Sequence, residues 1–245
     1  MPRGHQGASS RLITRKQLLA LLAITLMWGI NWPMMKFSLR EMTPLYFRAL
    51  TMSGGALGLF LFYRSRGLRM LPRGVEWRAV ITLGLPNVLG WHTASILGVK
   101  ELASGRAAIL GFTMPIWTVL LGTLFLGEKL NVWMLILTSL CLWVLAFVME
   151  PWPQWRFSVP MWGSLVYGAF INYGFAQIIW FGMARNLPPA TSAMSIMAVP
   201  MIGTLAATLI LGESPHWEDY VAMGCVMAAI SAVLLPSRTV RAAAP

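Results

Sequence analysis

Charged side chains are scarce in this sequence, and acidic side chains are the scarcest. Of the 245 residues 11% are charged, whereas soluble domains carry roughly a quarter. The eight Asp and Glu residues lie between the long apolar runs or at their ends, and none lies in the middle of a run. The low charge excludes a soluble globular domain. The position of the acids argues against the membrane-embedded carboxylate that many proton-coupled carriers use.

Cysteines and enzyme motifs are also few. The two cysteines, Cys141 and Cys225, each lie inside an apolar run, so no disulfide or metal framework is indicated. The sequence has no Walker loop, no Gly-x-Ser-x-Gly elbow, no His-Glu-x-x-His motif and no paired Asp motif. We therefore predict that the protein is not an enzyme and uses no cofactor or metal. Any transport would be secondary, driven by gradients.

Long hydrophobic runs are what the sequence has in abundance, since 57% of its residues are hydrophobic. Apolar runs of about 20 residues cross a bilayer as helices. Short connections between the runs favour antiparallel helical hairpins. The predicted fold class is all-α, a polytopic membrane helix bundle of about eight transmembrane helices, at residues 17–36, 46–63, 79–98, 107–127, 132–149, 162–183, 190–212 and 220–235.

The net charge of +11 is concentrated between these helices. We interpret it as the charge that orients a membrane protein, and we expect no nucleic-acid partner. With the N-terminus in the cytoplasm, the inner segments hold thirteen Lys and Arg residues and the outer segments hold four. The positive-inside rule then places both termini in the cytoplasm. We predict a multi-pass protein of a bacterial inner membrane.

An internal repeat links the two halves of the chain at a constant offset of 85 residues. The offset spans three predicted helices, an odd number, so the second copy enters the membrane with the opposite orientation. Such inverted repeats are typical of secondary transporters. The matched residues, written as first and second copy, are Trp77 and Trp162, Asn87 and Asn172, Leu102 and Leu187, Ala108 and Ala193, Pro115 and Pro200, Leu120 and Leu205, Thr123 and Thr208, Leu124 and Leu209, and Leu-Gly-Glu at 126–128 and 211–213.

Four stretches together resemble the EamA-type drug/metabolite transporter superfamily: WGINWPMMK at 28–36, PLYFRAL at 44–50, LPPATSAM at 187–194, and the helix from a proline to Leu-Gly-Glu in both halves. The resemblance implies ten helices in two inverted halves of five, a central cavity, and export of metabolites, amino acids or drugs. This sequence departs from that pattern, because PWPQWRFSVP leads from the fifth helix directly into what resembles the eighth.

The predicted organisation is therefore an incomplete inverted repeat of five and three helices. Its parts are a basic cytoplasmic tail at 1–16, a first EamA-like repeat at 17–149, a periplasmic connector at 150–161, a partial second repeat at 162–236 and a cytoplasmic tail at 237–245. Two spans' worth of sequence, roughly fifty residues by length, are missing from the second copy.

Polar and aromatic residues inside the spans are the candidates for a substrate cavity. Asn87 with His92, and Asn172 with Gln177, are polar pairs at the same repeat positions. The alternative for the amides is hydrogen bonding between helices. His92 either carries a proton during exchange or is a neutral packing residue. The full predicted lining is Trp28, Asn31, Asn87, Trp91, His92, Asn172, Gln177 and Trp180.

The proline-to-Leu-Gly-Glu helices contain two further kinds of site. Pro115 and Pro200 each predict a kink, either lining a cavity or serving packing. The glycines predict helix ends, and the glutamates that follow suit the positive N-terminus of the next helix. We interpret Gly127, Glu128, Gly212 and Glu213 as structural residues.

Two cations and a glycine pair complete the candidates. Lys36 either reaches an anionic group or extends to the membrane interface, and Arg48 has the same two interpretations. Gly54 and Gly58 permit close helix packing.

The sequence thus predicts a secondary membrane transporter, an exporter of small metabolites, amino acids or drugs that works by alternating access. Its expected partners are the lipid bilayer and a small-molecule substrate. Proton or ion coupling and a homodimer both stay open. The alternative is a shortened, transport-incompetent membrane protein that acts as a partner subunit or survives as a relic.

Overall fold

A computed structural model describes residues 14–68, 74–113, 132–184 and 198–234. Every regular element in these ranges is a helix, which confirms the all-α class. By length and composition, α1 (Arg15–Ser38) and α2 (Pro44–Ser65) can each cross a bilayer. The remaining elements are α3 (Gly74–Leu83), η1 (Gly84–Leu89), α4 (Gly90–Glu101), α5 (Ser104–Gly111), α7 (Val132–Met149), α8 (Val159–Val166), η2 (Tyr167–Phe175), α9 (Ala176–Ala184), α11 (Val199–Leu211) and α12 (Trp217–Leu234).

Helix boundaries follow local signals in the sequence. Thr14 starts α1 with a reciprocal capping box to Gln17. Pro44 opens α2, where its missing N–H costs nothing. Gly212 ends α11 in the left-handed region, at φ 70°. Pro115, Gly127 and Glu128 lie outside the described residues.

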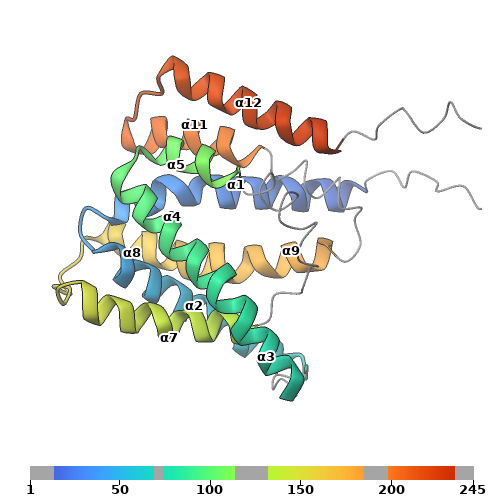
Figure 1. Cartoon of the computed structure of the whole chain (residues 1–245), viewed down its shortest axis with the longest axis vertical. Coiled ribbons are helices and arrows are strands. Elements are labelled where there is room, and N and C mark those ends of the chain that lie inside the picture. Colours follow the sequence, from blue (N-terminus) through green and yellow to red (C-terminus); the bar gives the residue numbers. More distant parts are fainter. Residues whose placement is uncertain (1–13, 69–73, 114–131, 185–197, 235–245) are drawn as a thin grey trace, which may run out of the picture.

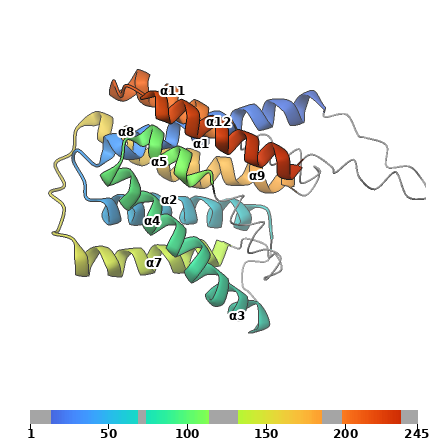
Figure 2. The ribbon, with the colours of Figure 1, turned by 45° about the horizontal axis from the view of Figure 1, so that its top comes forward.

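Two π-helices lie at equivalent positions of the 85-residue repeat. α3, η1 and α4 follow one another without a break, and so do α8, η2 and α9. The first run begins at Gly74 and the second at Val159, which is the offset found in the sequence. In Figures 1 and 2 the two runs point in opposite directions through the bundle. The described helices therefore display the inverted relation between the copies.

The bundle has α1 and α2 at its centre. α2 lies between α7 and η2, and α1 packs against α11, α5 and the run from α8 to α9 (Figure 1). The α3–η1–α4 run crosses the bundle diagonally, and α12 lies on the outside beside α5 (Figure 2). The core accordingly joins elements from both copies, including Tyr46, Phe47, Ile96 and Tyr173.

Glycines set the closest helix contact. A Cβ added to Gly55 would lie 2.3 Å from Tyr173 Cβ, and one added to Gly54 would lie 2.7 Å from Ala169 Cβ. At Gly58 the nearest atom, on Phe170, is 3.7 Å away. The glycine-rich face of α2 therefore packs against η2, with Gly55 at the tightest point.

The outward surface is apolar along much of its length. Leu19, Val148 and Leu209 are among many large hydrophobic side chains that face outward. Exposed Trp152, Trp155 and Trp162 belong to a chain of edge-to-face aromatic contacts between α7 and α8. Apolar walls with tryptophans near a helix end are what a lipid-facing bundle presents.

Candidate functional site

A buried cation lies between the two copies of the repeat. Arg48 on α2 is 2% exposed. Its guanidinium donates hydrogen bonds to the Tyr173 hydroxyl on η2, to Met35 Sδ at 2.9 Å and to Ser95 Oγ at 3.1 Å. Because the side chain points into the bundle, the interpretation of Arg48 as extending to the interface is wrong. We call Met35, Arg48, His92, Ser95 and Tyr173 the arginine cluster.

The aromatic members hold the guanidinium from one side. The Arg48 Cζ atom lies 5.8 Å from the centre of the Tyr173 ring. The Tyr173 hydroxyl is 3.1 Å from His92 Nδ1, and the two rings meet edge to face at 5.2 Å. Tyr173 is thereby fixed between a cation and an imidazole, which orients its hydroxyl.

The arginine cluster lies inward from the helix starts at the capped end of the bundle, the end where Glu41, Glu150 and Glu213 each cap a helix. Glu41 beside α2 accepts a 2.7 Å hydrogen bond from the N–H of Ser158 beside α8, so both helices start at one end. At 1.5 Å per residue, Arg48 lies about 6 Å and Tyr173 about 21 Å from those starts. Their side chains meet between these two distances, inside the bundle.

The charge of Arg48 has no acidic partner in the ranges that the structure describes. Its hydrogen-bond acceptors are a phenol, a thioether and a hydroxyl, all neutral. Its Nε is buried without an acceptor. Burying a cation among neutral groups is costly, and such residues in membrane proteins are typical of functional sites.

The predicted cavity residues separate into several places. His92 belongs to the arginine cluster, and Asn172, beside Tyr173, is buried. Trp28 and Trp180 contact each other at 5.3 Å between ring centres. Trp91 packs with Trp32 over Gly111. Asn31 and Gln177 are half-buried, and the side chain of Asn87 lies outside the described ones.

Pro200 lies at a different place in its helix from the one predicted. α11 begins at Val199, so the proline occupies its first turn, where it breaks no helical hydrogen bond. Residues 190–197, the predicted first part of this helix, lie outside the described ranges.

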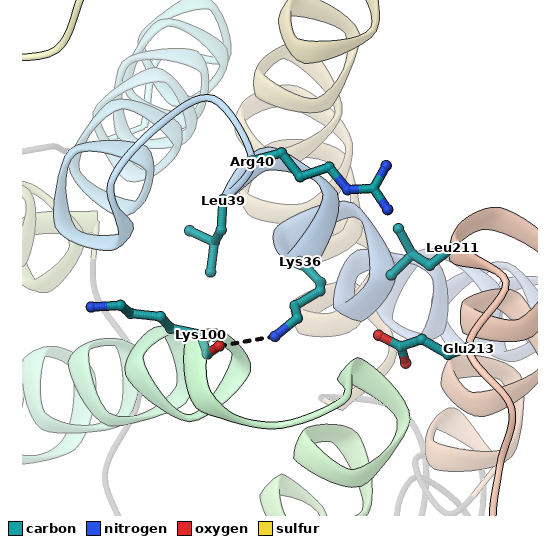
Figure 3. Close-up of a pocket in the computed structure, with 6 residues that line it drawn as sticks. All are labelled: Lys36, Leu39, Arg40, Lys100, Leu211 and Glu213. Carbon is teal, nitrogen blue, oxygen red and sulfur yellow. Dashed lines mark hydrogen bonds between the residues drawn. The ribbon is translucent and has the colours of Figure 1, made fainter.

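A surface pocket of about 250 Å³ lies away from the arginine cluster, at the end of the bundle where α1, α4 and α11 finish (Figure 3). Its lining is Lys36, Leu39, Arg40, Lys100, Leu211 and Glu213. Lys36 Nζ donates to three carbonyl oxygens at the end of α4, those of Val99, Lys100 and Leu102, at 2.8–2.9 Å. All three of its N–H donors are therefore used by carbonyl oxygens at this end of the bundle.

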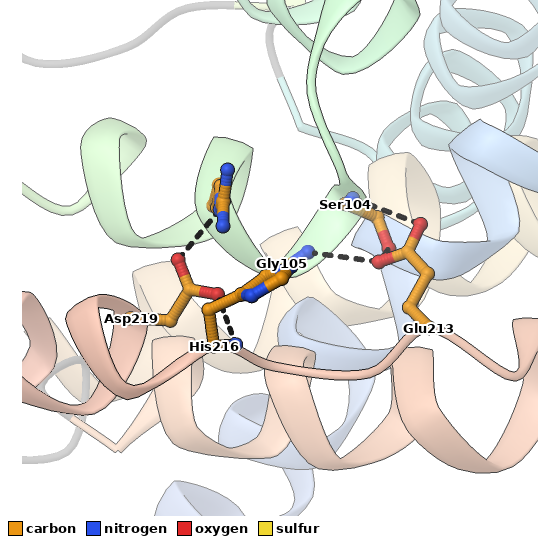
Figure 4. A network of polar contacts seen from close by, with 6 residues as sticks. Ser104, Gly105, Glu213, His216 and Asp219 are labelled. Carbon is orange, nitrogen blue, oxygen red and sulfur yellow. Dashed lines mark hydrogen bonds and ion pairs between the residues drawn. The ribbon is translucent and has the colours of Figure 1, made fainter.

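Three glutamates at this same end cap the N-termini of distant helices. Glu41 accepts from Ser158 before α8, and Glu150 accepts from the N–H groups of Leu45 and Tyr46 in α2. Glu213 accepts from Ser104 N at 3.1 Å, Ser104 Oγ at 2.9 Å and Gly105 N at 3.4 Å (Figure 4). Each carboxylate meets the positive end of a helix dipole. We call this face the capped end.

The role of Glu213 differs from the predicted one. The sequence assigned it to the start of the following helix, but α12 begins at Trp217 and has Glu218 and Asp219 in its own first turn. The helix that Glu213 caps is α5. Position in the sequence suggested that Glu213 caps α12. Tertiary packing instead brings the start of α5 within hydrogen-bonding distance of its carboxylate.

An ion pair joins α5 and α12 beside this cap. The Arg106 Nε donates to Asp219 Oδ1 at 2.7 Å, and Asp219 also accepts from the His216 N–H at 2.8 Å. Burial raises the pKa of the Asp219 carboxyl, but the His216 and Arg106 hydrogen bonds outweigh burial and hold the pKa below its ordinary value.

Sequence reasoning did not identify most of the arginine cluster. It named His92, left Arg48 between reaching an anionic group and extending to the membrane interface, and did not single out Met35, Ser95 or Tyr173. The signal for Arg48 was a charged residue inside an apolar span, where such residues tend to face the bundle interior. Tyr173 directly follows the repeated Asn172.

The chain is similar to several proteins described as transporters. It is 21% identical to the uncharacterized transporter YoaV of Bacillus subtilis, over 81% of this chain and 89% of the relative. It is 29% identical to the uncharacterized transporter YvbV of the same organism, over 49% of this chain and 38% of the relative. An uncharacterized transporter of Archaeoglobus fulgidus is 26% identical over 48% of this chain and 41% of the relative. No solved structure matched the chain.

The alignment with YoaV extends over 261 positions, although only 81% of a 245-residue chain takes part. Many positions of that relative therefore have no counterpart here. The model of the EamA-like transporter family matches this chain twice, at residues 15–150 and 130–235. Together the two matches cover nearly all the described helices, so the chain is a membrane transporter by descent and belongs to the EamA-like transporter family.

Proposed function

We propose that the protein is a gradient-driven exporter of small metabolites that works by alternating access. The observation that carries this proposal is the pair of π-helices at equivalent repeat positions, one of which contributes Tyr173 to a buried polar cluster. π-Helices inside α-helices are frequent at functional sites. Secondary transporters with inverted repeats build their substrate sites near the midplane, at the interface of the repeats.

The packing supports two alternating states. The capped end is closed by Glu41, Glu150 and Glu213, which tie the starts of α8, α2 and α5 to other segments. By the positive-inside rule this end faces the periplasm, and both termini face the cytoplasm. In an exporter, these contacts would release when the site opens outward.

A partner subunit is the second candidate function. The positions of YoaV without counterpart here favour it, because a shortened second repeat supplies fewer walls for a central cavity. A homodimer would offer one way to complete the cavity. Activity of the purified chain separates the two candidates.

The test is solute efflux from proteoliposomes that contain the full chain. Liposomes are loaded with radiolabelled amino acids, nucleosides and organic acids, and a pH or Na⁺ gradient is imposed. We expect at least one solute to leave faster than from protein-free liposomes, and to do so only while the gradient persists. If every solute leaves the proteoliposomes no faster than it leaves protein-free liposomes, at low and at high protein density, the partner subunit is favoured.

A further inference from the structure

A buried arginine with an unpaired Nε points to the chemistry of the substrate. We propose that Arg48 binds the carboxylate group of an anionic substrate through the guanidinium edge formed by Nε and Nη2. This inference deepens the proposed function and rests on it. Nε lies buried with no acceptor, and Nη2 is held by Met35 Sδ and Ser95 Oγ.

The present acceptors satisfy the guanidinium poorly. A thioether sulfur is a weak acceptor, and a hydroxyl carries no charge to balance the cation. A carboxylate presents two oxygens at the spacing of two neighbouring guanidinium N–H groups, and such bidentate pairs are among the strongest hydrogen-bonded contacts in proteins. The acidic residues of this chain all lie outside the predicted spans, so an incoming ligand is the natural source of that charge.

Met35 is the group that a carboxylate would displace. The Tyr173 hydroxyl accepts from Nη1, which is not part of the Nε–Nη2 edge, and His92 holds that hydroxyl in place. Met35 has an unbranched, flexible side chain, so it can leave Nη2 by a change of rotamer. One carboxylate oxygen would then take the place of the sulfur on Nη2.

Binding here would connect both copies of the repeat. Arg48 and Ser95 belong to the first copy, on α2 and α4, and Tyr173 belongs to the second, on η2. Met35 brings in α1. A bound ligand would replace hydrogen bonds that now join these elements, and would therefore favour one packing arrangement over another. Coupling of binding to alternating access requires such a preference.

The experiment measures binding to the purified full chain in detergent, by calorimetry and thermal shift. The probes are matched pairs of equal shape: acetate and acetamide, lactate and lactamide, benzoate and benzamide, nicotinate and nicotinamide. We expect at least one carboxylate to bind at least tenfold more tightly than its amide. Arg48→Lys, which keeps the charge and loses the planar edge, should abolish that preference.

Two further variants keep the test decisive. Met35→Leu removes the competing sulfur and should leave the melting temperature nearly unchanged while carboxylate binding tightens. Arg48→Gln removes the charge and should also abolish the preference for carboxylates. If this variant does not fold, Arg48→Lys and Met35→Leu still test the proposal. The proposal is overturned if every amide binds as well as its acid, if the preference survives in Arg48→Lys, or if inorganic phosphate binds more tightly than every carboxylate.

Failure of this inference is distinguishable from failure of the proposed function. Carboxylate binding without efflux from proteoliposomes would contradict the exporter and leave the site standing. Efflux of neutral solutes that is unchanged in Arg48→Lys would contradict the site and leave the exporter standing.

Discussion

At the residue scale, the chain places its few acids where they replace missing helix partners. A helix leaves its first N–H groups without internal acceptors, and in a membrane protein water is not always available to supply them. Glu41, Glu150 and Glu213 each supply a carboxylate to the start of a helix distant in sequence. These residues cap helices, whereas Arg48 is buried among neutral acceptors.

Loss of the cap at Glu150 should destabilise α2. In Glu150→Gln a neutral amide replaces the carboxylate that accepts from Leu45 and Tyr46, so we expect a cost of about 1–2 kcal/mol. The melting temperature in detergent is the measurement, with Glu101→Gln, at an exposed position in the last turn of α4, as control. An equal effect of both substitutions would refute the cap.

The Asp219 ion pair should make stability depend on pH. The pKa of this carboxyl is lowered in the folded protein, so its contribution is complete above the ordinary value of about 3.9 and is lost as the pH falls through the folded value. We expect Asp219→Asn to melt below the unsubstituted protein at pH 7. The gap should close once the pH falls below the lowered pKa of Asp219 in the folded protein. A gap that is constant with pH would show that the charge has no role.

At the element scale, the fit between α2 and η2 positions the arginine cluster. η2 carries Tyr173, and Gly55 lets the backbone of η2 approach α2 closely. The same two elements carry the Arg48–Tyr173 hydrogen bond. Packing and site geometry are therefore linked, and a change at the contact should reach the site.

Gly55→Ala tests this link. The new methyl would lie 2.3 Å from Tyr173 Cβ and 3.1 Å from the Ala169 carbonyl oxygen, so the backbone of α2 or η2 must shift. We expect a loss of about 1–3 kcal/mol by overpacking and weaker carboxylate binding. The control is Gly98→Ala on α4, where a Cβ meets no atom within 4 Å and alanine favours a helix. Equal stability and binding of the two variants would contradict the contact.

At the scale of the whole molecule, local signals predicted the architecture and missed most of the site. Helix lengths follow from apolar runs, and the inverted repeat follows from a constant offset, so both could be read along the chain. The arginine cluster joins residues on α1, α2, α4 and η2, and its Arg48–Tyr173 hydrogen bond joins residues 125 positions apart. No local pattern gives that proximity. The helix that Glu213 caps was not predicted for the same reason, because α5 approaches Glu213 only through tertiary packing.

The orientation of the bundle is also testable. After replacement of Cys141 and Cys225 by serine, single cysteines are introduced as Arg156→Cys at the capped end and Ser65→Cys at the opposite end. We expect a membrane-impermeant maleimide to label position 156 in intact cells. Position 65 should be labelled only after the cells are permeabilised. The reverse pattern would invert the proposed topology.

The central claim is that a buried arginine between inverted repeats serves carrier-mediated exchange. Counterflow tests it most directly: proteoliposomes are loaded with the carboxylate that binds most tightly, and uptake of the same labelled carboxylate is followed. We predict that internal substrate accelerates uptake with the unsubstituted chain, and that Arg48→Lys reduces uptake to the level of protein-free liposomes. Uptake that internal substrate does not accelerate, or that is equal in Arg48→Lys, would contradict it.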